Sequence, residues 1–266
     1  MPDALNAGTR IYWEAHGQGE PVLLIMGLGA TMALWHRVTP ILSDKYRTIL
    51  LDNRGAGRSD APPGPYSIPQ MADDALAVLD AAGATDARVF GASMGGMIAQ
   101  ELALNHPERV RSLILGCTAV GGNAAVLADR EVGVALASRV TLPPHQAARV
   151  MVPYTYDAST PRERVEEDVA IRERTAISND AFNAQYQAIR SWPGTLDRLG
   201  ALAMPVLVIH GETDRLVPPE NGRILARAIP HSKLVMIPHA SHIFFTDQPE
   251  ASQAAILSFL SSSSRP

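Results

Sequence analysis

Short apolar runs alternate with longer amphipathic stretches through the first 116 residues of the chain. Residues Ile11–His16 alternate apolar and polar side chains, as expected for a strand near a sheet edge. The next run, Pro21–Met26, is continuously apolar and ends at Gly27, as expected for a strand buried on both faces. Further runs of this kind occur at Arg47–Leu51, Arg88–Phe90 and Val110–Leu115. This spacing predicts a mostly parallel sheet with crossover helices.

Two stretches between these runs predict helices that cover the sheet. Ser67 and Gln70 form a capping box at the start of the first, and Gly83 supplies its C-terminal stop. The second is the apolar stretch Met97–Leu104, which lies between two predicted strands. The order of strand, helix and strand is therefore that of a crossover unit.

The pattern changes between residues 116 and 204, where strand-like runs disappear and charged helical windows separated by prolines replace them. Strands are predicted again at Pro205–Ile209 and Lys233–Ile237. Helices are predicted at Pro219–Ala228 and Pro249–Leu260. The gap in the alternation favours one domain with an insertion over two independent domains.

The resulting domain prediction has two parts. Residues 1–119 and 197–266 form an α/β core domain, and residues 120–196 form a helical lid inserted into it. A chain of 266 residues is long enough for one large domain of this kind.

The composition is that of an ordinary globular chain and argues against several classes of function. A hydrophobic content of 46%, a charged content of 19% and a formal net charge of -4 disfavour disorder and a basic nucleic-acid-binding surface. The apolar runs are shorter than the roughly 18 residues that a membrane-spanning helix needs. The N-terminal residues lack the features of a secretory signal, and the single cysteine, Cys117, cannot form an intramolecular disulfide. We therefore expect a cytoplasmic protein that acts neither on nucleic acids nor at a membrane.

Gly91, Ser93 and Gly95 match the pattern G-x-S-x-G directly after a buried strand and directly before a helix. In this context the serine occupies a strained turn in which flanking side chains would clash, and the helix N-terminus favours negative charge. A serine hydroxyl is a weak nucleophile near neutral pH, so it needs a histidine base and an acid that fixes the tautomer of that histidine. Ser93 is therefore the candidate nucleophile.

The two partners of this serine are expected downstream, each just after a strand. Asp214 and His242 satisfy this requirement, and the carboxyl ends of parallel strands meet at one sheet edge. Glu212 and His239 are the nearest rivals, but Glu212 is expected to face away and His239 directly follows a strand end. His210 ends a buried strand and is expected to have a structural role. The sequence therefore predicts a triad of serine, aspartate and histidine.

These motifs together resemble those of the α/β-hydrolase-fold serine hydrolases over essentially the whole chain. The resemblance implies a mostly parallel central sheet flanked by helices, with a helical lid inserted after the sixth strand. Residues Gly27–Gly29 resemble the first oxyanion loop of that family, and Asp52–Ser59 resemble its D-x-R-G-x-G-x-S turn. The resemblance implies oxyanion donors at the backbone N–H groups of Leu28 and Met94. Many relatives have His-Gly where this chain has Met26 and Gly27; because the donor is main chain, we expect the oxyanion hole to be retained.

The residues at other positions favour some branches of this family over others. Serine rather than aspartate at position 93 argues against haloalkane dehalogenases and epoxide hydrolases, which need a carboxylate nucleophile. Leu28–Ala30 and Ile243 stand where carbon–carbon bond hydrolases of ring-cleavage products usually have Gly-Pro-Gly and tryptophan, which weakens that branch. Pro62–Ile68 together with Ser93–Gly96 are most similar to 3-oxoadipate enol-lactonases and related small ester hydrolases.

The resemblance implies a hydrolase without cofactor or metal that cleaves small carboxylic esters or lactones through an acyl-enzyme on Ser93. Residues of the oxyanion loop, the lid and the histidine loop are expected to line the substrate pocket: Met26, Gly27, Tyr154, Trp192 and Ile243. Alternatively, the lid aromatics pack within the lid itself. Three other functions use the same triad: a ligand-sensing signalling protein with slow turnover, a perhydrolase or haloperoxidase, and a carbon–carbon bond hydrolase.

Overall fold

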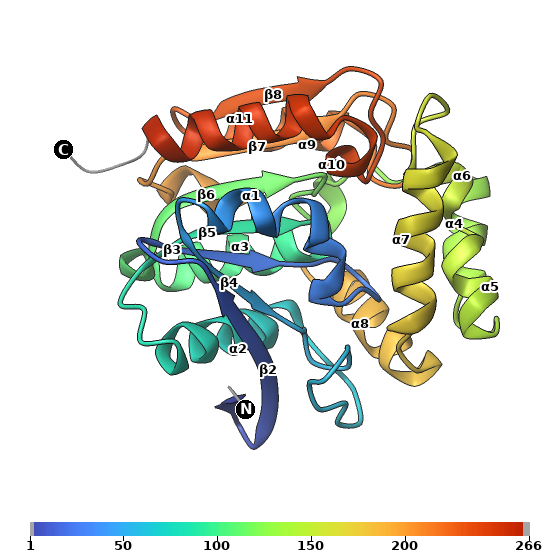
Figure 1. Cartoon of the computed structure of the whole chain (residues 1–266), viewed down its shortest axis with the longest axis horizontal. Helices are drawn as coiled ribbons and strands as arrows, with labels where there is room; N and C mark the ends of the chain where they lie inside the picture. Colours follow the sequence, from blue (N-terminus) through green and yellow to red (C-terminus); the bar gives the residue numbers. More distant parts are fainter. Residues whose placement is uncertain (1–2, 263–266) are drawn as a thin grey trace.

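The computed structural model describes residues 3–262, apart from the side chains of residues 144 and 145. An eight-stranded sheet with the order β1-β2-β4-β3-β5-β6-β7-β8 forms its centre (Figure 1). The strands are β1 (Asp3–Asn6), β2 (Thr9–His16), β3 (Pro21–Ile25), β4 (Arg47–Leu51), β5 (Ala87–Ala92), β6 (Val110–Gly116), β7 (Val206–Gly211) and β8 (Lys233–Ile237). β2 runs antiparallel to β1 and β4, and the remaining neighbours are parallel.

Helices cover both faces of the sheet. One face carries α2 (Ile68–Ala81), α3 (Met94–Asn105) and α9 (Glu220–Ala228). The other carries the 3-10 helix η1 (Met32–Arg37) with α1 (Thr39–Ser43), α10 (Phe244–Asp247) and α11 (Pro249–Ser262). Ser67 caps α2 by accepting a hydrogen bond from the Gln70 N–H, as the capping box predicts.

The strands bury alternate residues on opposite faces, so the sheet separates two cores. In β3, Leu23 and Ile25 belong to the core beneath α2, α3 and α9. Val22 and Leu24 belong to the core beneath α1 and α11. All four side chains are fully buried, which is why the sequence of β3 is continuously apolar rather than alternating.

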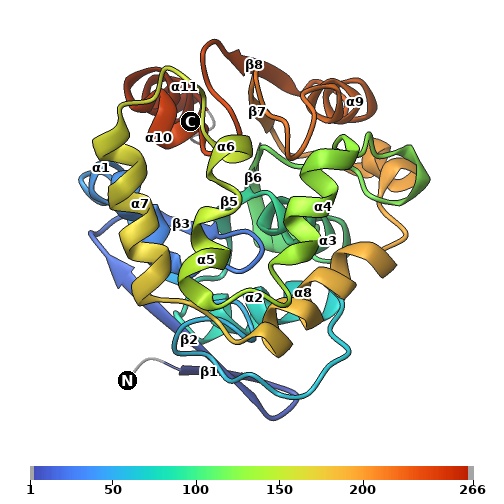
Figure 2. The same cartoon turned by 90° about the vertical axis from the view of Figure 1, so that its right-hand side faces the viewer.

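The segment between β6 and β7 folds mainly into helices, and we call it the lid. These helices are α4 (Arg130–Ser138), α5 (Pro144–Arg149), α6 (Val152–Thr155), α7 (Arg162–Arg174) and α8 (Asn179–Ser191), with η3 (Gly122–Ala124) and η4 (Leu196–Ala201) at the two ends. In Figure 2 the lid helices lie in front of the carboxyl ends of the parallel strands. The lid therefore covers the sheet edge at which the predicted triad is expected.

The N-terminal part of the chain contains elements that the hydrophobic pattern does not reveal. β1 is a four-residue edge strand that pairs with β2, and α1 contains five residues. Both are too short to show a clear period.

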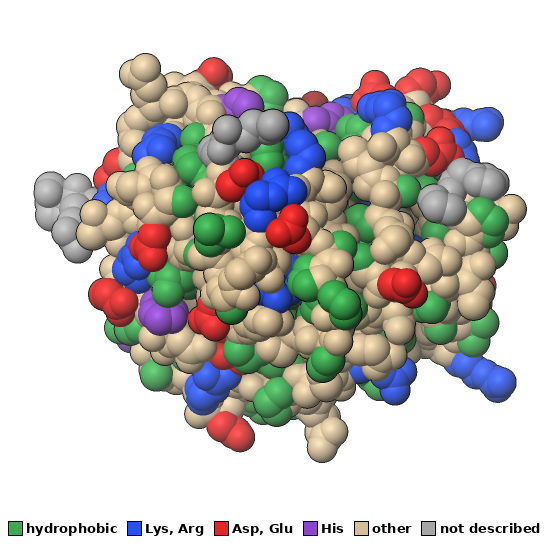
Figure 3. Space-filling model, turned by 90° about the horizontal axis from the view of Figure 1, so that it is seen from below, with side chains coloured by type: hydrophobic (Ala, Val, Ile, Leu, Met, Phe, Trp, Pro, Cys, Tyr) green, Lys and Arg blue, Asp and Glu red, His purple; other side chains and the backbone are tan. Residues whose placement is uncertain are grey.

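Among the described residues, none of the helices is both long and apolar enough to cross a membrane. Acidic and basic side chains are interspersed on the face that Figure 3 shows.

Candidate active site

Ser93 occupies a strained turn between β5 and α3. Its backbone has φ 58° and ψ -122°, which L-residues rarely adopt, and its N–H donates to the Gly116 carbonyl at 2.9 Å. A Cβ on Gly91 would lie 2.1 Å from the carbonyl oxygen of Gly95. A Cβ on Gly95 would lie 2.0 Å from the carbonyl oxygen of Ile25. The turn therefore needs both glycines, and it places Ser93 at the N-terminus of α3.

We expect Gly95→Ala to lower the free energy of unfolding by at least about 2 kcal/mol. The three atoms nearest to the added Cβ all belong to the backbone of Ile25 and Met26, so no side chain can rotate away. Urea unfolding measures the effect. Gly200→Ala in η4 is the matched control, because the added Cβ meets nothing within 4 Å and the change is expected to be neutral or stabilising by up to about 1 kcal/mol. Equal stability of the two variants would contradict the steric account of the turn.

Asp214 and His242 form a buried hydrogen-bonded pair. His242 Nδ1 lies 2.8 Å from Asp214 Oδ2, while Asp214 Oδ1 accepts from the backbone N–H groups of Leu216 and Val217 at 2.9 and 2.8 Å. Burial alone would raise the pKa of Asp214, but the charges and hydrogen bonds of His242 and His210 outweigh it and lower the pKa to about 2. Asp214 is therefore ionised near neutral pH, and His242 donates its Nδ1 proton to it.

His210 supports the same carboxylate from β7. It is fully buried, and its Nε2 lies 2.8 Å from the Val217 carbonyl oxygen and 3.2 Å from Asp214 Oδ2. Both neighbours are acceptors, so this nitrogen carries the proton. The sequence predicts a structural histidine here but not its contact with the aspartate. The two rivals for the triad, Glu212 and His239, are exposed.

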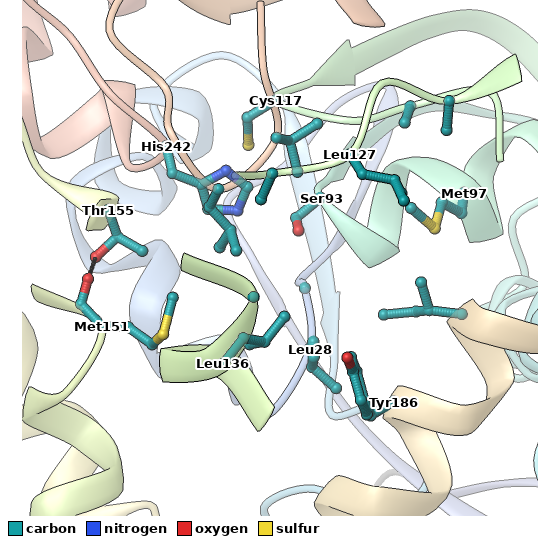
Figure 4. A pocket seen from close by; sticks show the side chains of 18 of the residues that line it. Leu28, Ser93, Met97, Cys117, Leu127, Leu136, Met151, Thr155, Tyr186 and His242 are labelled. Atoms are coloured by element: carbon teal, nitrogen blue, oxygen red, sulfur yellow. Dashed lines mark hydrogen bonds between the residues drawn. The ribbon is translucent and has the colours of Figure 1, made fainter. Parts of the chain in front are cut away.

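Ser93 and His242 face the same space. Figure 4 shows the serine hydroxyl and the imidazole at one wall of a cavity, with Leu28 and Tyr186 across from them. Among residues 3–262 no hydrogen bond joins Ser93 to His242. Because Nδ1 of His242 is bound to Asp214, its other nitrogen is the one available to a group in the cavity. The structure thus brings the three predicted residues together, with the serine and the histidine not yet in hydrogen-bond contact.

The loop after β3, which we call the oxyanion loop (residues 26–30), lies against the serine. A Cβ on Gly27 would lie 2.9 Å from Ser93 Cβ, so the loop approaches the serine closely. Within the described part of the chain, neither the Leu28 N–H nor the Met94 N–H has an acceptor. Two unsatisfied donors from adjacent segments beside one hydroxyl fit the oxyanion hole predicted from the resemblance.

Side-chain amides hold this loop in place. Asn53 donates to the Met26 carbonyl oxygen at 2.8 Å. Gln185 of α8 accepts from the Gly29 N–H at 2.9 Å and donates to the Arg54 carbonyl oxygen at 2.8 Å. Asn53 lies inside the predicted turn motif, but nothing in the sequence indicates Gln185, because its contact joins residues 156 positions apart. The lid therefore fixes the oxyanion loop directly.

The cavity between the sheet and the lid has a volume of about 1140 Å³. Met26, Gly27, Trp192 and Ile243 line it, as the sequence predicts. Most of its wall is apolar, and the apolar residues that line it include Leu28, Met97, Leu127, Leu136 and Met151. Cys117 also lines it, and burial raises the pKa of its thiol well above the usual range, so the thiol is protonated. Among the described residues, no group of three or more histidine, cysteine or acidic side chains is placed to hold a metal ion.

The prediction that Tyr154 lines the pocket is wrong. Its hydroxyl donates to Glu131 at 2.9 Å, and the guanidinium of Arg215 lies over its ring at 5.0 Å. The next two residues, Thr155 and Tyr156, line the cavity instead. Successive side chains on a helix point about 100° apart, so the short helix α6 turns Tyr154 away from the cavity.

Asp247 positions the loop that carries His242, which the sequence does not reveal. Its Oδ2 accepts from the backbone N–H of Ser241 at 2.6 Å and from that of Asp157 at 3.3 Å, and its Oδ1 accepts from the Thr160 hydroxyl at 2.6 Å. Burial raises the pKa of this carboxyl to about 6, and the three hydrogen bonds offset only part of that effect. One carboxyl therefore joins the histidine loop to the lid.

The raised pKa of Asp247 has a consequence for stability. A folded-state pKa near 6 against an ordinary value of 3.8 means that the protonated form stabilises the fold below pH 4, and that this contribution is lost as the pH rises through 6. We expect the free energy of unfolding of Asp247→Asn, relative to wild type, to increase by about 2 kcal/mol between pH 4 and pH 8. Urea unfolding across this range measures it, with the exposed Glu108→Gln as the control. A difference that does not change with pH would contradict the assignment.

Comparison with known proteins identifies the family. The model of the family described as "alpha/beta hydrolase fold" matches residues 20–249. The chain belongs to the α/β-hydrolase fold family. The fold and the family expected from the sequence are thereby confirmed for this α/β hydrolase.

Three relatives illustrate the range of this family. The α/β hydrolase is 32% identical to "Putative carbamate hydrolase RutD" of Azorhizobium caulinodans, over 97% of this chain and 98% of the relative. It is 33% identical to "Putative non-heme bromoperoxidase BpoC" of Mycobacterium tuberculosis, over 94% and 97% of the two chains. It superposes on the crystal structure of the enol-lactonase from Burkholderia xenovorans LB400 with a TM-score of 0.87, at 27% identity over 98% of this chain and 100% of the other. An enzyme of the α/β-hydrolase type is therefore supported, while the relatives differ in the reactions they are named for.

Proposed function

We propose that this α/β hydrolase cleaves small carboxylic esters or lactones through an acyl-enzyme on Ser93, without a cofactor. The observation that carries the proposal is the pair of Asp214 and His242, joined at 2.8 Å, whose imidazole faces the same cavity as the Ser93 hydroxyl. The apolar wall of that cavity suits the carbon skeleton of an ester or lactone.

In the first half of the reaction His242 acts as the general base. Its Nδ1 proton is held by Asp214, so the lone pair on Nε2 accepts the Ser93 proton as the serine oxygen attacks the acyl carbon. The backbone N–H groups of Leu28 and Met94 then stabilise the negative oxygen of the tetrahedral intermediate. The N-terminus of α3 adds its dipole at the same position.

In the second half the same groups work in reverse. His242 gives its proton to the leaving oxygen, and the bond between that oxygen and the acyl carbon breaks. In a lactone the leaving oxygen remains attached to the acyl chain. Water, deprotonated by His242, then attacks the acyl-enzyme; the acid leaves, and Ser93 regains its proton.

Labelling with a fluorophosphonate tests this proposal before any substrate is known. We expect one adduct, located on Ser93 by intact mass and peptide mapping, followed by hydrolysis of members of an ester and lactone panel. Ser191→Ala is a matched control, because this serine also lines the cavity while its hydroxyl donates to a carbonyl of its own helix. A folded protein that forms no adduct and hydrolyses no ester would contradict the proposal.

A second candidate is perhydrolysis, in which hydrogen peroxide replaces water in attacking the acyl-enzyme. The observation that favours it is the 33% identity to BpoC across 94% of the chain. The product would be a peroxyacid in place of the acid. A comparison of peroxyacid formation with ester hydrolysis on the same acyl donor distinguishes the two functions.

A further inference from the structure

The Leu28 N–H is the oxyanion donor that lies on a loop. It belongs to the peptide unit between Gly27 and Leu28, and the carbonyl of that unit accepts from the Ala30 N–H at 3.4 Å, which is long for a hydrogen bond of this kind. The other donor, the Met94 N–H, lies at the first residue of α3 and is fixed by the helix. The direction of the Leu28 N–H therefore depends on what holds the neighbouring peptide units.

Amide side chains hold the peptide units on both sides of it. Asn53 donates to the Met26 carbonyl oxygen at 2.8 Å and so fixes the unit before it. Gln185 accepts from the Gly29 N–H at 2.9 Å and so fixes the unit after it. Both side chains are buried, with exposed fractions of 2% and 0%. Because a peptide unit is planar and turns only about the bonds at its two ends, fixing both neighbours fixes the direction of the N–H between them.

Gln185 is itself attached to a fixed point of the core. Its Nε2 donates to the Arg54 carbonyl oxygen at 2.8 Å. The guanidinium of Arg54 pairs with Asp74 of α2 through two hydrogen bonds of 2.6 Å, and both side chains are buried. The amide of Gln185 thus joins the oxyanion loop to a segment that the core holds in place.

The helix that carries Gln185 packs against both of the segments that this side chain joins. Gly29 has φ 67°, and a Cβ there would lie 2.8 Å from Phe182 Cδ2 of α8. A Cβ on Gly55, the residue after Arg54, would lie 3.1 Å from Ala181 Cβ of the same helix. Because α8 belongs to the lid, part of the support for the oxyanion hole comes from outside the α/β core.

We propose that Gln185 is a positioning residue for the reaction: it directs the Leu28 N–H toward the oxyanion of the tetrahedral intermediate, and the lid thereby contributes to catalysis. This inference rests on the proposed ester or lactone hydrolysis. Gln185 acts on the substrate only through the loop. The hydrogen bond that it positions strengthens as negative charge develops on the acyl oxygen, so its loss is expected in kcat rather than in KM.

Kinetics of Gln185→Met test the proposal. Methionine keeps the unbranched shape of glutamine and removes both hydrogen bonds. We expect kcat on a chromogenic ester from the panel to fall by about 10- to 100-fold, less than the loss of a whole oxyanion donor would cause, because the Leu28 N–H is displaced and not deleted. KM is expected to change by less than about threefold. An unchanged kcat would overturn the proposal.

An alkyl trifluoromethyl ketone measures the oxyanion hole directly. Its carbonyl carbon bonds to the Ser93 oxygen, the serine proton passes to His242, and the former carbonyl oxygen becomes an oxyanion in the hole. The inhibition constant for Gln185→Met is expected to rise by the same factor by which its kcat/KM falls, about 10- to 100-fold. Loss of turnover with full affinity for the ketone would mean that the substitution impairs another step, and would overturn the proposal.

Gln100→Met is the matched control for the loss of a buried amide. Gln100 of α3 is fully buried, donates to the Gly96 and Ala119 carbonyl oxygens, and accepts from the Thr195 hydroxyl. None of these three partners belongs to the oxyanion loop. Its replacement is expected to lower the melting temperature at least as much as Gln185→Met does, but to change kcat and the affinity for the ketone by less than about threefold. Equal losses of kcat in the two variants would show that Gln185 has only a structural role.

Gln185→Glu provides a second readout, the dependence of the activity on pH. A protonated carboxyl offers the same acceptor and donor as the amide, whereas a carboxylate has no proton for the Arg54 carbonyl oxygen. The kcat of this variant, as a fraction of the wild-type kcat at each pH, is therefore expected to be highest at pH 5 and to fall toward pH 8. A fraction as low as that of Gln185→Met at every pH would contradict the proposal.

The behaviour of the wild-type protein separates this inference from the proposed function. If wild type hydrolyses esters and is labelled on Ser93, but Gln185→Met keeps the wild-type kcat and affinity for the ketone, the inference fails while the proposed function stands. If wild type hydrolyses no ester and is not labelled, the proposed function fails and the inference fails with it. Circular dichroism establishes whether Gln185→Met is folded; if it is not, the pH dependence of Gln185→Glu decides.

Discussion

Ser93→Ala is expected to lower kcat on the preferred ester by about 10⁶-fold, the largest effect of any single substitution in this protein. The proposed reaction begins with attack by the serine oxygen, and no other nucleophile at the turn between β5 and α3 can replace it. Cys117 lines the same cavity, but burial raises its thiol pKa well above the usual range and leaves it protonated. Steady-state kinetics with a chromogenic ester, with the protein purified away from host esterases, measures the loss.

The fold of Ser93→Ala is expected to be intact. Among the described residues the Ser93 hydroxyl makes no hydrogen bond, so its removal leaves no buried partner unsatisfied, and the strained backbone is held by Gly116 and Thr118. Circular dichroism and thermal unfolding should therefore match wild type. Residual activity within tenfold of wild type in a folded variant would exclude the acyl-enzyme mechanism.

The hydrophobic pattern predicts the parallel part of the sheet well because those strands are buried on both faces. Val22 to Ile25 are fully buried, and this burial is what a continuous apolar run reports. The hairpin of β1 and β2 is harder to predict, because Leu5 of β1 is 72% exposed and the strand has only four residues. The hydrophobic pattern of a strand thus reveals the strand only where all of its residues are buried to the same extent.

The residues of the candidate site also fall into two groups, those that the sequence predicts and those that it does not. Ser93, Asp214 and His242 can be found in the sequence because each follows a strand, and parallel strands bring their carboxyl ends to one edge. Gln185 and Asp247 cannot, because their roles depend on contacts between the lid and distant loops. Tyr154 shows most clearly what the sequence does not predict. A tyrosine is a suitable residue for a pocket wall, but the direction of this side chain is set by α6. The start and the orientation of α6 depend on tertiary packing.

Asp214→Asn is expected to lower kcat by about 10⁴-fold, the second largest effect. Asp214 Oδ1 accepts two backbone N–H groups, from Leu216 and Val217, so an asparagine would place its oxygen there. Its amide nitrogen would then face His242 Nδ1 with a donor. The imidazole would have to lose its Nδ1 proton and carry the proton on the nitrogen that faces the cavity, where it could no longer act as a base. Kinetics over pH 5–9 measures the loss.

The pH dependence and a neighbouring control separate this tautomer effect from general damage. Near neutrality, a higher pH is not expected to restore the activity of Asp214→Asn to the wild-type level, because the wrong tautomer of His242 is neutral and does not lose a proton there. This tautomer persists until the hydroxide concentration is high enough for another base to act. Glu212→Gln, two residues away in the same loop and exposed, changes the charge without touching the histidine and is expected to alter kcat by less than about twofold. If Glu212→Gln proved as damaging as Asp214→Asn, or if Asp214→Asn kept wild-type kcat at pH 7, a different residue would have to orient His242.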